Sequence, residues 1–167
     1  MKNILISGGS GLVGHKITQL LELKGYSVAW LSRSEQKQKS FLWDVEKQTI
    51  DEESVEWADA IINLAGAGVA ENRWTDERKK LILESRTHST RLLYDAVEKA
   101  SEKPNTFISA SAVGYYGLDT GTSLMEETLV PGTDFLAQVV CDWESEVKKM
   151  EELHLRTVML IICIVLD

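Results

Sequence analysis

Residues Lys2 to Lys24 read K-N-I-L-I-S-G-G-S-G-L-V-G-H-K-I-T-Q-L-L-E-L-K, and this stretch decides the fold. Asn3 to Ile6 is an apolar run typical of a buried parallel strand, and the leucines and isoleucine from Leu12 onward recur at helical spacing. A glycine-rich turn joins the two. Glycines let the backbone approach a ligand closely, and the free N–H groups of a helix start favour a pyrophosphate. The alternative is a plain strand-to-helix turn. We expect cofactor contacts from Gly8, Gly9, Ser10, Gly11, Leu12, Val13 and Gly14.

The second strand, Tyr26 to Ser32, bears on which dinucleotide binds. Gly25 before it is the expected end of the first helix. NAD-binding units place an acidic side chain about 20 residues after the glycines, where it binds the ribose hydroxyls. This chain has Ser32 there, followed by Arg33, which favours a 2′-phosphate and therefore predicts NADP(H) over NAD(H). The alternative for Arg33 is a solvated loop charge.

Strands and helices alternate along the rest of the chain. Further strands are expected at 41–43, 59–64, 106–110 and 155–166, with helices at 51–57, from a Thr75 cap to 100, and after a cap at Thr133. This order predicts one domain over 1–167, an α/β Rossmann-like, doubly wound parallel sheet of about six strands in three αβα layers. Polar and small residues at the strand ends would then meet in one crevice and contact the cofactor, namely Asp44, Asn63, Leu64, Ala65, Gly66 and Ser109. For Asp44 an Asx turn into Glu46 is the alternative.

Composition excludes some classes of partner. The net charge of −8 argues against nucleic acid and against an anionic membrane surface, because phosphate binding needs clustered Lys and Arg. The apolar run 159–166 is too short to cross a bilayer. Cys141 and Cys163 lack metal-ligand spacing, so we expect no metal site and two reduced core thiols. With no signal peptide before Lys2, the expected location is the cytoplasm.

A set of later motifs adds a resemblance to a family. Together with the glycine turn, the chain has the motifs Trp43-Asp44, Asn63-Leu64-Ala65-Gly66, Arg73-Trp74-Thr75, Ser85-Arg86, Ser109 to Gly117, Asp134 to Ala137 and Trp143-Glu144. In these it resembles the epimerase-family branch of the atypical or extended short-chain dehydrogenase/reductases, whose members are often named NAD-dependent epimerase/dehydratase or nucleoside-diphosphate-sugar epimerase. The resemblance runs the length of the chain and implies NADP(H) binding.

The resemblance also implies what to expect of the rest of the site. Extended members build most of the substrate pocket from a second half, so this chain would hold the cofactor half only. The superfamily's catalytic Tyr-x-x-x-Lys should open the last helix, where Phe135 and Val139 stand instead and neither can transfer a proton. Ser111 matches the superfamily's catalytic serine. Tyr115 and Tyr116 are the nearest candidate proton donors, unless both rings only pack the loop.

Two functions therefore stay open. One is an NADP(H)-dependent oxidoreductase or epimerase acting on an unknown small molecule, in which the cofactor performs the hydride chemistry. The other is a cofactor-binding sensor or interaction protein without catalysis, favoured by the missing Tyr and Lys. The resemblance further suggests a homodimer in which the helix over 75–100 and the last helix pair with their copies. The alternative is that these two helices only cover the sheet.

Overall fold

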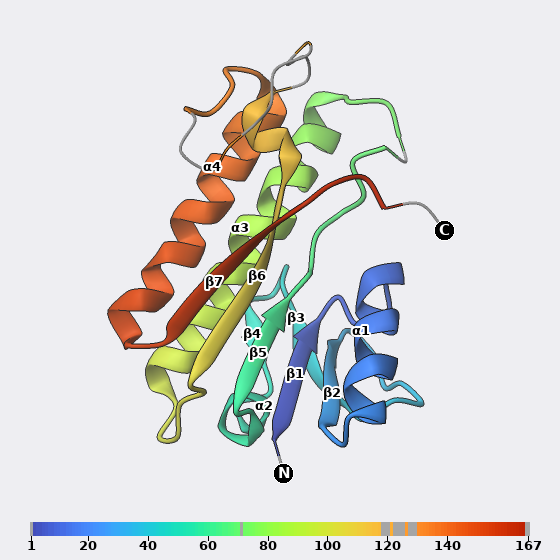
Figure 1. The fold of residues 1–167 in the computed structure, drawn as a ribbon, viewed down its shortest axis with the longest axis vertical. Helices are drawn as coiled ribbons and strands as arrows, with labels where there is room; N and C mark the ends of the chain where they lie inside the picture. The colour runs from blue at the N-terminus through green and yellow to red at the C-terminus, as the bar shows by residue number, and fades with distance from the viewer. Residues whose placement is uncertain (1, 71, 118–120, 122–125, 127–129, 166–167) are drawn as a thin grey trace.

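A seven-stranded sheet runs through the centre of the protein (Figure 1). The computed structural model describes residues 2–70, 72–117, 121, 126 and 130–165. In spatial order the strands are β4, β3, β2, β1, β5, β6 and β7, and every neighbouring pair is parallel except β3 with β4. Their bounds are β1 Asn3–Ser7, β2 Ser27–Ser32, β3 Ser40–Asp44, β4 Thr49–Ile50, β5 Ala60–Asn63, β6 Thr106–Ala112 and β7 Arg156–Ile162.

This order confirms the doubly wound α/β fold. The chain winds outward from β1 through β2 and β3, then returns to the other side of β1 as β5 and winds outward again through β6 and β7. The direction reverses between β1 and β5, and ligands of open α/β sheets bind at that point, beyond the carboxyl ends of the strands. The glycine turn follows β1 directly, so the fold places it at this reversal.

Two strand predictions need correction. The six expected strands form, but a seventh, β4, pairs antiparallel with β3 through Trp43 with Ile50 and Asp44 with Thr49. Two residues are too few for a periodic pattern, so the sequence did not indicate this strand. The last strand ends at Ile162 instead of continuing over 155–166; residue 166 lies outside the described part of the chain.

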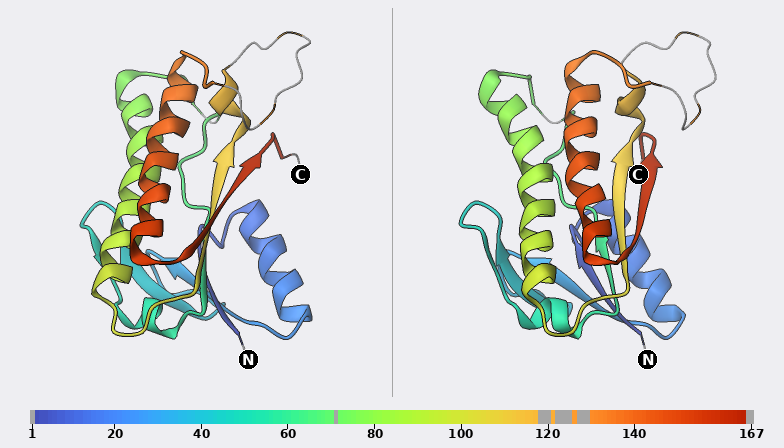
Figure 2. Two further views of the ribbon diagram at one scale, coloured as in Figure 1. Left: turned by 60° about the vertical axis from the view of Figure 1, so that its left-hand side comes forward. Right: turned by 90° about the vertical axis from the view of Figure 1, so that its left-hand side faces the viewer.

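Helices cover both faces of the sheet (Figure 2). The helix α1, Leu12–Leu23, lies on one face, whereas α3, Asp76–Lys99, and α4, Phe135–Lys148, lie side by side on the other. Each face has its own apolar core, one formed by β-strand residues under α1 and a larger one under α3 and α4. The three expected layers are therefore present. Short helical segments complete the chain: α2 Glu53–Trp57, η1 Val113–Tyr116 and η2 Lys149–Leu153.

Capping and stop residues in the sequence predict most helix ends correctly. Gly25 ends α1 with a φ of +83°, a conformation that favours glycine. Thr75 caps α3, because its side chain accepts a hydrogen bond from the Arg78 backbone N–H. The predicted cap at Thr133 is wrong by one residue. Asp134 is the cap, and its Oδ1 accepts from the Ala137 N–H at 3.1 Å.

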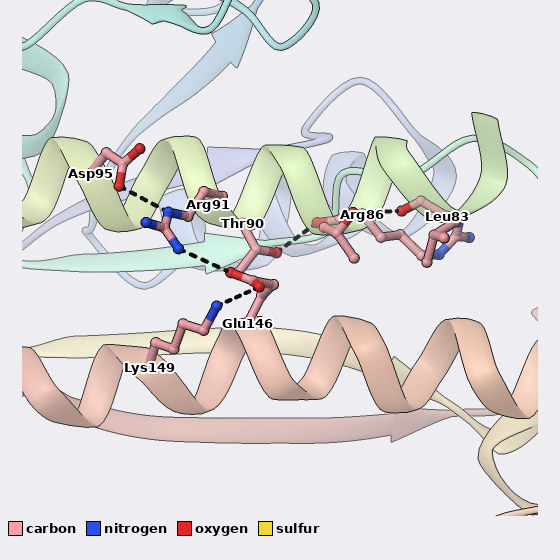
Figure 3. Close-up of polar contacts among 8 residues, drawn as sticks. Leu83, Arg86, Thr90, Arg91, Asp95, Glu146 and Lys149 are labelled. Atoms are coloured by element: carbon pink, nitrogen blue, oxygen red, sulfur yellow. Dashed lines mark hydrogen bonds and ion pairs between the residues drawn. The ribbon is translucent and has the colours of Figure 1, made fainter. Parts of the chain in front are cut away.

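The neighbouring helices α3 and α4 are linked by polar contacts (Figure 3). Glu146 of α4 lies 4.0 Å from the Arg91 guanidinium of α3 and 2.5 Å from the Lys149 ammonium, and Arg91 also pairs with Asp95 at 3.1 Å. Partly exposed ion pairs of this kind contribute only about 0–1 kcal/mol each. The apolar contacts beneath them hold the two helices together.

The two cysteines are unpaired, as predicted, but the prediction that both lie in the core is wrong. Both cysteines are free, but Cys163 is exposed just beyond β7 and Cys141 is only half-buried on α4. The apolar residues around Cys163 suggested burial, but they are exposed as well, with Leu160 51% and Ile164 81% accessible. The described residues hold no helix that is both long and apolar enough to cross a membrane.

Candidate functional site

Three glycines of the turn, Gly8, Gly9 and Gly14, are required for packing within the protein, whether or not a ligand binds. Gly8 has a φ of +73°, and a Cβ there would lie 2.8 Å from the carbonyl carbon and oxygen of Leu64. A Cβ at Gly14 would lie 2.4 Å from the Gly8 oxygen, and one at Gly9 would lie 2.3 Å from the Trp30 ring. These contacts are closer than real Cβ atoms make, so the turn, α1 and the loop after β5 can pack together only with glycine at these positions.

Gly11 differs from the other three. Its φ of −75° is open to any residue, and an added Cβ would meet only the Gly8 oxygen, at 3.4 Å. The protein therefore leaves space beside Gly11 that a side chain would occupy. This is the cradle that a closely approaching ligand needs.

The start of α1 is open to an anion. Gly11 is its N-cap and provides no side-chain hydrogen bond, whereas the side chains of Thr75 and Asp134 cap α3 and α4. The N–H groups in the first turn of a helix have no partner within the helix, and the helix dipole adds partial positive charge there. The residues from Gly8 to Gly14 thus fit a pyrophosphate in both shape and charge.

A buried polar network lies beneath the point where the sheet reverses. The Ser7 hydroxyl donates to Asn63 Oδ1 at 2.6 Å, and Asn63 Nδ2 donates to Thr90 Oγ1 at 3.0 Å and to Ser109 Oγ at 3.5 Å. All four side chains are fully buried. The Leu64 N–H also donates to Ser7 Oγ, which fixes the start of the loop after β5 against the end of β1.

This network bears on two predicted cofactor contacts, Asn63 and Ser109. Their side chains bond to each other and to neighbouring elements and do not reach the surface. Contact of either residue with a cofactor therefore remains a prediction, and it would have to involve backbone atoms. Leu64, Ala65 and Gly66 continue the chain beyond β5; Leu64 and Ala65 lie beside Gly8, whereas Gly66 lies against the Arg86 side chain.

Two of the residues predicted to contact the cofactor, Arg33 and Asp44, line one pocket. Arg33 follows β2, Asp44 ends β3, and both border a cavity of about 480 Å³ that Lys47 and Asp51 also line. Asp44 forms the Asx turn that was the alternative for it, because Oδ1 accepts from the backbone N–H groups of Glu46 and Lys47. The Lys47 ammonium lies 2.9 Å from Asp44 Oδ2 and is the main reason why the pKa of Asp44 lies below its usual value.

Arg33 is left as the available cation of this pocket. Its side chain is exposed, and among the described contacts it makes no ion pair, whereas Lys47 is bound to Asp44. Ser32 is half-buried at the end of β2, and its Oγ accepts from the Gln36 side chain at 3.1 Å. The structure therefore brings Ser32, Arg33 and Asp44 to the same edge of the sheet, as expected.

One of the predicted catalytic residues, Ser111, is bonded to a carboxylate, Glu144, for which the sequence predicted no role. Ser111 lies on β6 and is buried, with 2% of its surface exposed. Its hydroxyl donates to Glu144 Oε1 of α4 at 2.5 Å. Tyr115 and Tyr116 follow in η1, with their rings 5.3 Å apart and edge to face. Desolvation, and after it the charges of Cys141 and Glu144, raise the pKa of Tyr115 above its ordinary value.

Glu144 could have been found from its place in the helical pattern. It belongs to the same stripe of α4 as the buried Ala137, Val140 and Val147, and a carboxylate on such a stripe is uncommon without a function or a partner. The raised pKa of Tyr115 has a chemical consequence. A raised pKa keeps the hydroxyl protonated but makes it a weaker acid, so proton donation from Tyr115 would need a neighbour or a bound cofactor to lower that pKa.

Phe135 opens α4, where the superfamily's tyrosine was expected. Its ring lies 5.5 Å from the Trp74 ring, and the Lys79 ammonium lies 5.5 Å from its centre. Trp74 in turn donates its ring N–H to the Val69 carbonyl oxygen at 2.8 Å. Phe135 therefore packs the start of α4 onto the chain that enters α3.

Two arginines of α3 hold the loop after β5. Arg86 Nη1 donates to the carbonyl oxygens of Ala67, at 3.1 Å, and Ile82, at 2.9 Å, while Arg78 Nη2 donates to the Gly68 oxygen. The Arg86 guanidinium also lies 5.5 Å from the centre of the Trp143 ring. An arginine in register with the buried stripe of α3 was the sequence signal for this role.

The fold and the site together define a class of protein. A glycine turn at the reversal of a parallel sheet, an uncapped helix start and an open position at Gly11 make a Rossmann-type dinucleotide-binding domain. Within this class, the model of the NAD dependent epimerase/dehydratase family matches residues 4–163, and the chain belongs to that family. The described residues hold no group of three or more His, Cys, Asp and Glu side chains suited to a metal ion.

Curated relatives and solved structures agree with this assignment. Epimerase family protein YfhF of Bacillus subtilis is 36% identical over 160 residues, which are 93% of this chain and 52% of that protein. Epimerase family protein Mb2239 of Mycobacterium bovis is 33% identical over 157 residues, 93% of this chain and 51% of that protein. The chain thus spans about half the length of the curated relatives it matches.

Two solved structures are similar in both sequence and fold. Human epimerase family protein SDR39U1, isoform 2, crystallised with NADPH, is 31% identical with a TM-score of 0.75, over 86% of this chain and 48% of that one. A nucleoside-diphosphate sugar epimerase from Corynebacterium glutamicum is 34% identical with a TM-score of 0.80, over 96% of this chain and 33% of that one. Both likenesses agree with the assignment of this chain to the epimerase family.

Proposed function

We propose that this chain is the NADP(H)-binding half of an oxidoreductase or nucleotide-sugar epimerase whose substrate is a small molecule. The observation that carries the proposal is the open Gly11 at the uncapped start of α1, where a pyrophosphate fits. The NADPH in the structure of SDR39U1 and the name of the Corynebacterium glutamicum protein support the cofactor and the substrate class. The second half of the curated relatives' length would supply most of the substrate pocket.

The preference for NADP(H) over NAD(H) is proposed from the adenosine side. Ser32 stands where an acidic side chain would bind ribose hydroxyls and repel a 2′-phosphate. Arg33 provides an exposed guanidinium at the rim of the 480 Å³ cavity. A guanidinium binds phosphate through two parallel hydrogen bonds, so it suits a 2′-phosphate in that position.

Calorimetric titration with NADPH and NADH tests this preference. A charge-assisted contact is worth roughly 1.5–3 kcal/mol, so NADPH should bind about 10- to 100-fold more tightly than NADH. Arg33→Ala should remove most of this difference. Lys37→Ala is the matched control, because Lys37 is an exposed cation of the same loop that does not line the cavity. Equal affinities in the wild type, or unchanged NADPH binding in Arg33→Ala, would contradict the assignment.

For the chemistry, a bound NADP(H) would supply the hydride, and this chain would supply orientation and proton control. We propose that Ser111 orients a substrate oxygen, with its hydroxyl fixed by Glu144 at 2.5 Å. Tyr115 or Tyr116 would act as the proton donor, and for Tyr115 a bound cofactor or a neighbouring group would have to lower the raised pKa. Turnover of NADPH by the full-length protein on sugar nucleotides and carbonyl compounds tests this. Ser111→Ala and the Tyr→Phe variant of whichever tyrosine is the donor are expected to lose about 100-fold or more in kcat.

A non-catalytic NADP(H) sensor or interaction protein is the second candidate. Phe135 and Val139 favour it, since they replace the proton-transferring pair and Phe135 is used in packing against Trp74. Tight NADPH binding without turnover on the same panel would select this function.

We also propose a cytoplasmic location and a homodimer through α3 and α4. Light scattering coupled to gel filtration tests the dimer, and a monomer would contradict it.

A further inference from the structure

Arg86 carries a positive charge for which the described part of the chain provides no contacting carboxylate. The guanidinium donates hydrogen bonds to the carbonyl oxygens of Ala67 and Ile82, and among the described residues no Asp or Glu lies within ion-pair distance of it. It is partly buried, and burial, followed by the charge of Arg78, lowers the pKa of the guanidinium. An arginine nevertheless stays protonated at every physiological pH.

The position of this charge is fixed closely by the loop above it. A Cβ added to Gly66 would lie 3.0 Å from the Arg86 Cζ, so the guanidinium lies directly against the Gly66 backbone. The same loop contacts the glycine turn two residues earlier, where Leu64 adjoins Gly8. The charge of Arg86 is therefore separated from the cofactor crevice by a single stretch of backbone.

The fold determines which part of a dinucleotide lies near this loop. In a doubly wound sheet the adenosine half lies over the first three strands, β1 to β3, and the nicotinamide half lies over the second set, which begins at β5. The loop that Arg86 supports leaves the carboxyl end of β5. The nicotinamide ring is cationic when oxidised and neutral when reduced, so a fixed cation on this side repels the oxidised ring alone.

We propose that Arg86 makes the cofactor site select the reduced dinucleotide over the oxidised one. The inference rests on the proposed binding of NADP(H). The opposing charge in this region is that of Glu144, next to Trp143 on α4 and bound to Ser111. Glu144 should attract the oxidised ring, so the two side chains shift the selectivity in opposite directions. Tight retention of the reduced form suits a protein that donates hydride or keeps NADPH bound.

The test is the ratio of the Kd of NADP+ to the Kd of NADPH, measured by calorimetry on one protein sample. Because both forms share the adenosine half and the pyrophosphate, the ratio isolates the nicotinamide ring. We expect a ratio of about 10 in the wild type, the size of effect that a nearby charge has on an ionisation equilibrium. Arg86→Met, which keeps an apolar stem, should reduce the ratio severalfold towards 1, and Arg86→Lys should keep it.

Two further variants serve as controls. Arg91→Met removes an exposed cation of the same helix, paired with Asp95, and should leave the ratio unchanged. Glu144→Gln should raise it. A wild-type ratio near 1, or a ratio that Arg86→Met leaves intact, would overturn the inference, as would a ratio that falls equally in Arg86→Lys. If Arg86→Met does not fold, the inference is tested by the other two measurements: the wild-type ratio should be about 10, and Glu144→Gln should raise it. Binding of neither form would instead refute the proposed function.

Discussion

Substituting alanine at Gly11 and, in a second variant, at Gly14 should separate cofactor binding from folding. At Gly11 the new methyl group meets only the Gly8 oxygen, at 3.4 Å. Loss of glycine as N-cap costs about 0.5–1 kcal/mol, and the lower entropy of the unfolded chain offsets about 0.4–1 kcal/mol. The free energy of unfolding of Gly11→Ala should therefore stay within about 0.5 kcal/mol of the wild-type value.

At Gly14 the same methyl group cannot be accommodated. Its Cβ would lie 2.4 Å from the Gly8 oxygen and 2.7 Å from the Gly9 Cα, both backbone atoms. Overpacking of this kind costs about 3 kcal/mol, of which the better helix propensity of alanine returns about 1 kcal/mol. A net loss of about 2 kcal/mol corresponds to a Tm lower by roughly 4–8 °C for a chain of this length.

Affinity should follow the opposite order. In Gly11→Ala the methyl group occupies the space beside the first turn of α1, so a pyrophosphate loses at least one charge-assisted contact, and NADPH should bind about 10- to 100-fold more weakly. Thermal unfolding followed by circular dichroism and calorimetric titration with NADPH measure the two effects. Wild-type affinity in a folded Gly11→Ala protein would refute the placement of the pyrophosphate. An unchanged Tm in Gly14→Ala would refute the steric argument.

Two further predictions concern the buried network and the tyrosine. Asn63→Ala should lower the free energy of unfolding by about 2–4 kcal/mol, because it leaves the Ser7 hydroxyl without its acceptor and opens a buried space. The control Asn105→Ala, on the surface, should change the free energy of unfolding by less than about 0.5 kcal/mol. Urea unfolding measures both values, and equal effects would contradict the role of the network. Tyr115 should ionise only above its ordinary pKa of 10.0, since desolvation raises that pKa. A spectrophotometric titration of tyrosinate, with Tyr115→Phe as the reference, should therefore show no ionisation of this group near neutral pH, and activity that depends on its proton should be lost only as the pH rises through the raised pKa.

Much of this protein follows from local sequence. The glycine turn between an apolar run and a helical pattern predicts β1, α1 and the binding point, because backbone dihedrals and side-chain periodicity are properties of neighbouring residues. The ends of α1 at Gly25 and of α3 at Thr75 were predicted for the same reason. Alternation of strands and helices then restricts the fold to a doubly wound parallel sheet, since parallel strands require crossovers of one hand.

Tertiary structure decided the features that depend on residues far apart in the chain. The bond from Ser111 to Glu144 joins positions 33 residues apart, and the bond from Ser7 to Asn63 joins positions 56 apart. The sequence places Arg86 in register with the buried stripe of α3, but only the packing of α3 against the loop after β5 shows that its charge lies partly buried against the Gly66 backbone. No local pattern encodes such contacts, because their energy comes from which surfaces the sheet brings together and from the water that is excluded between them.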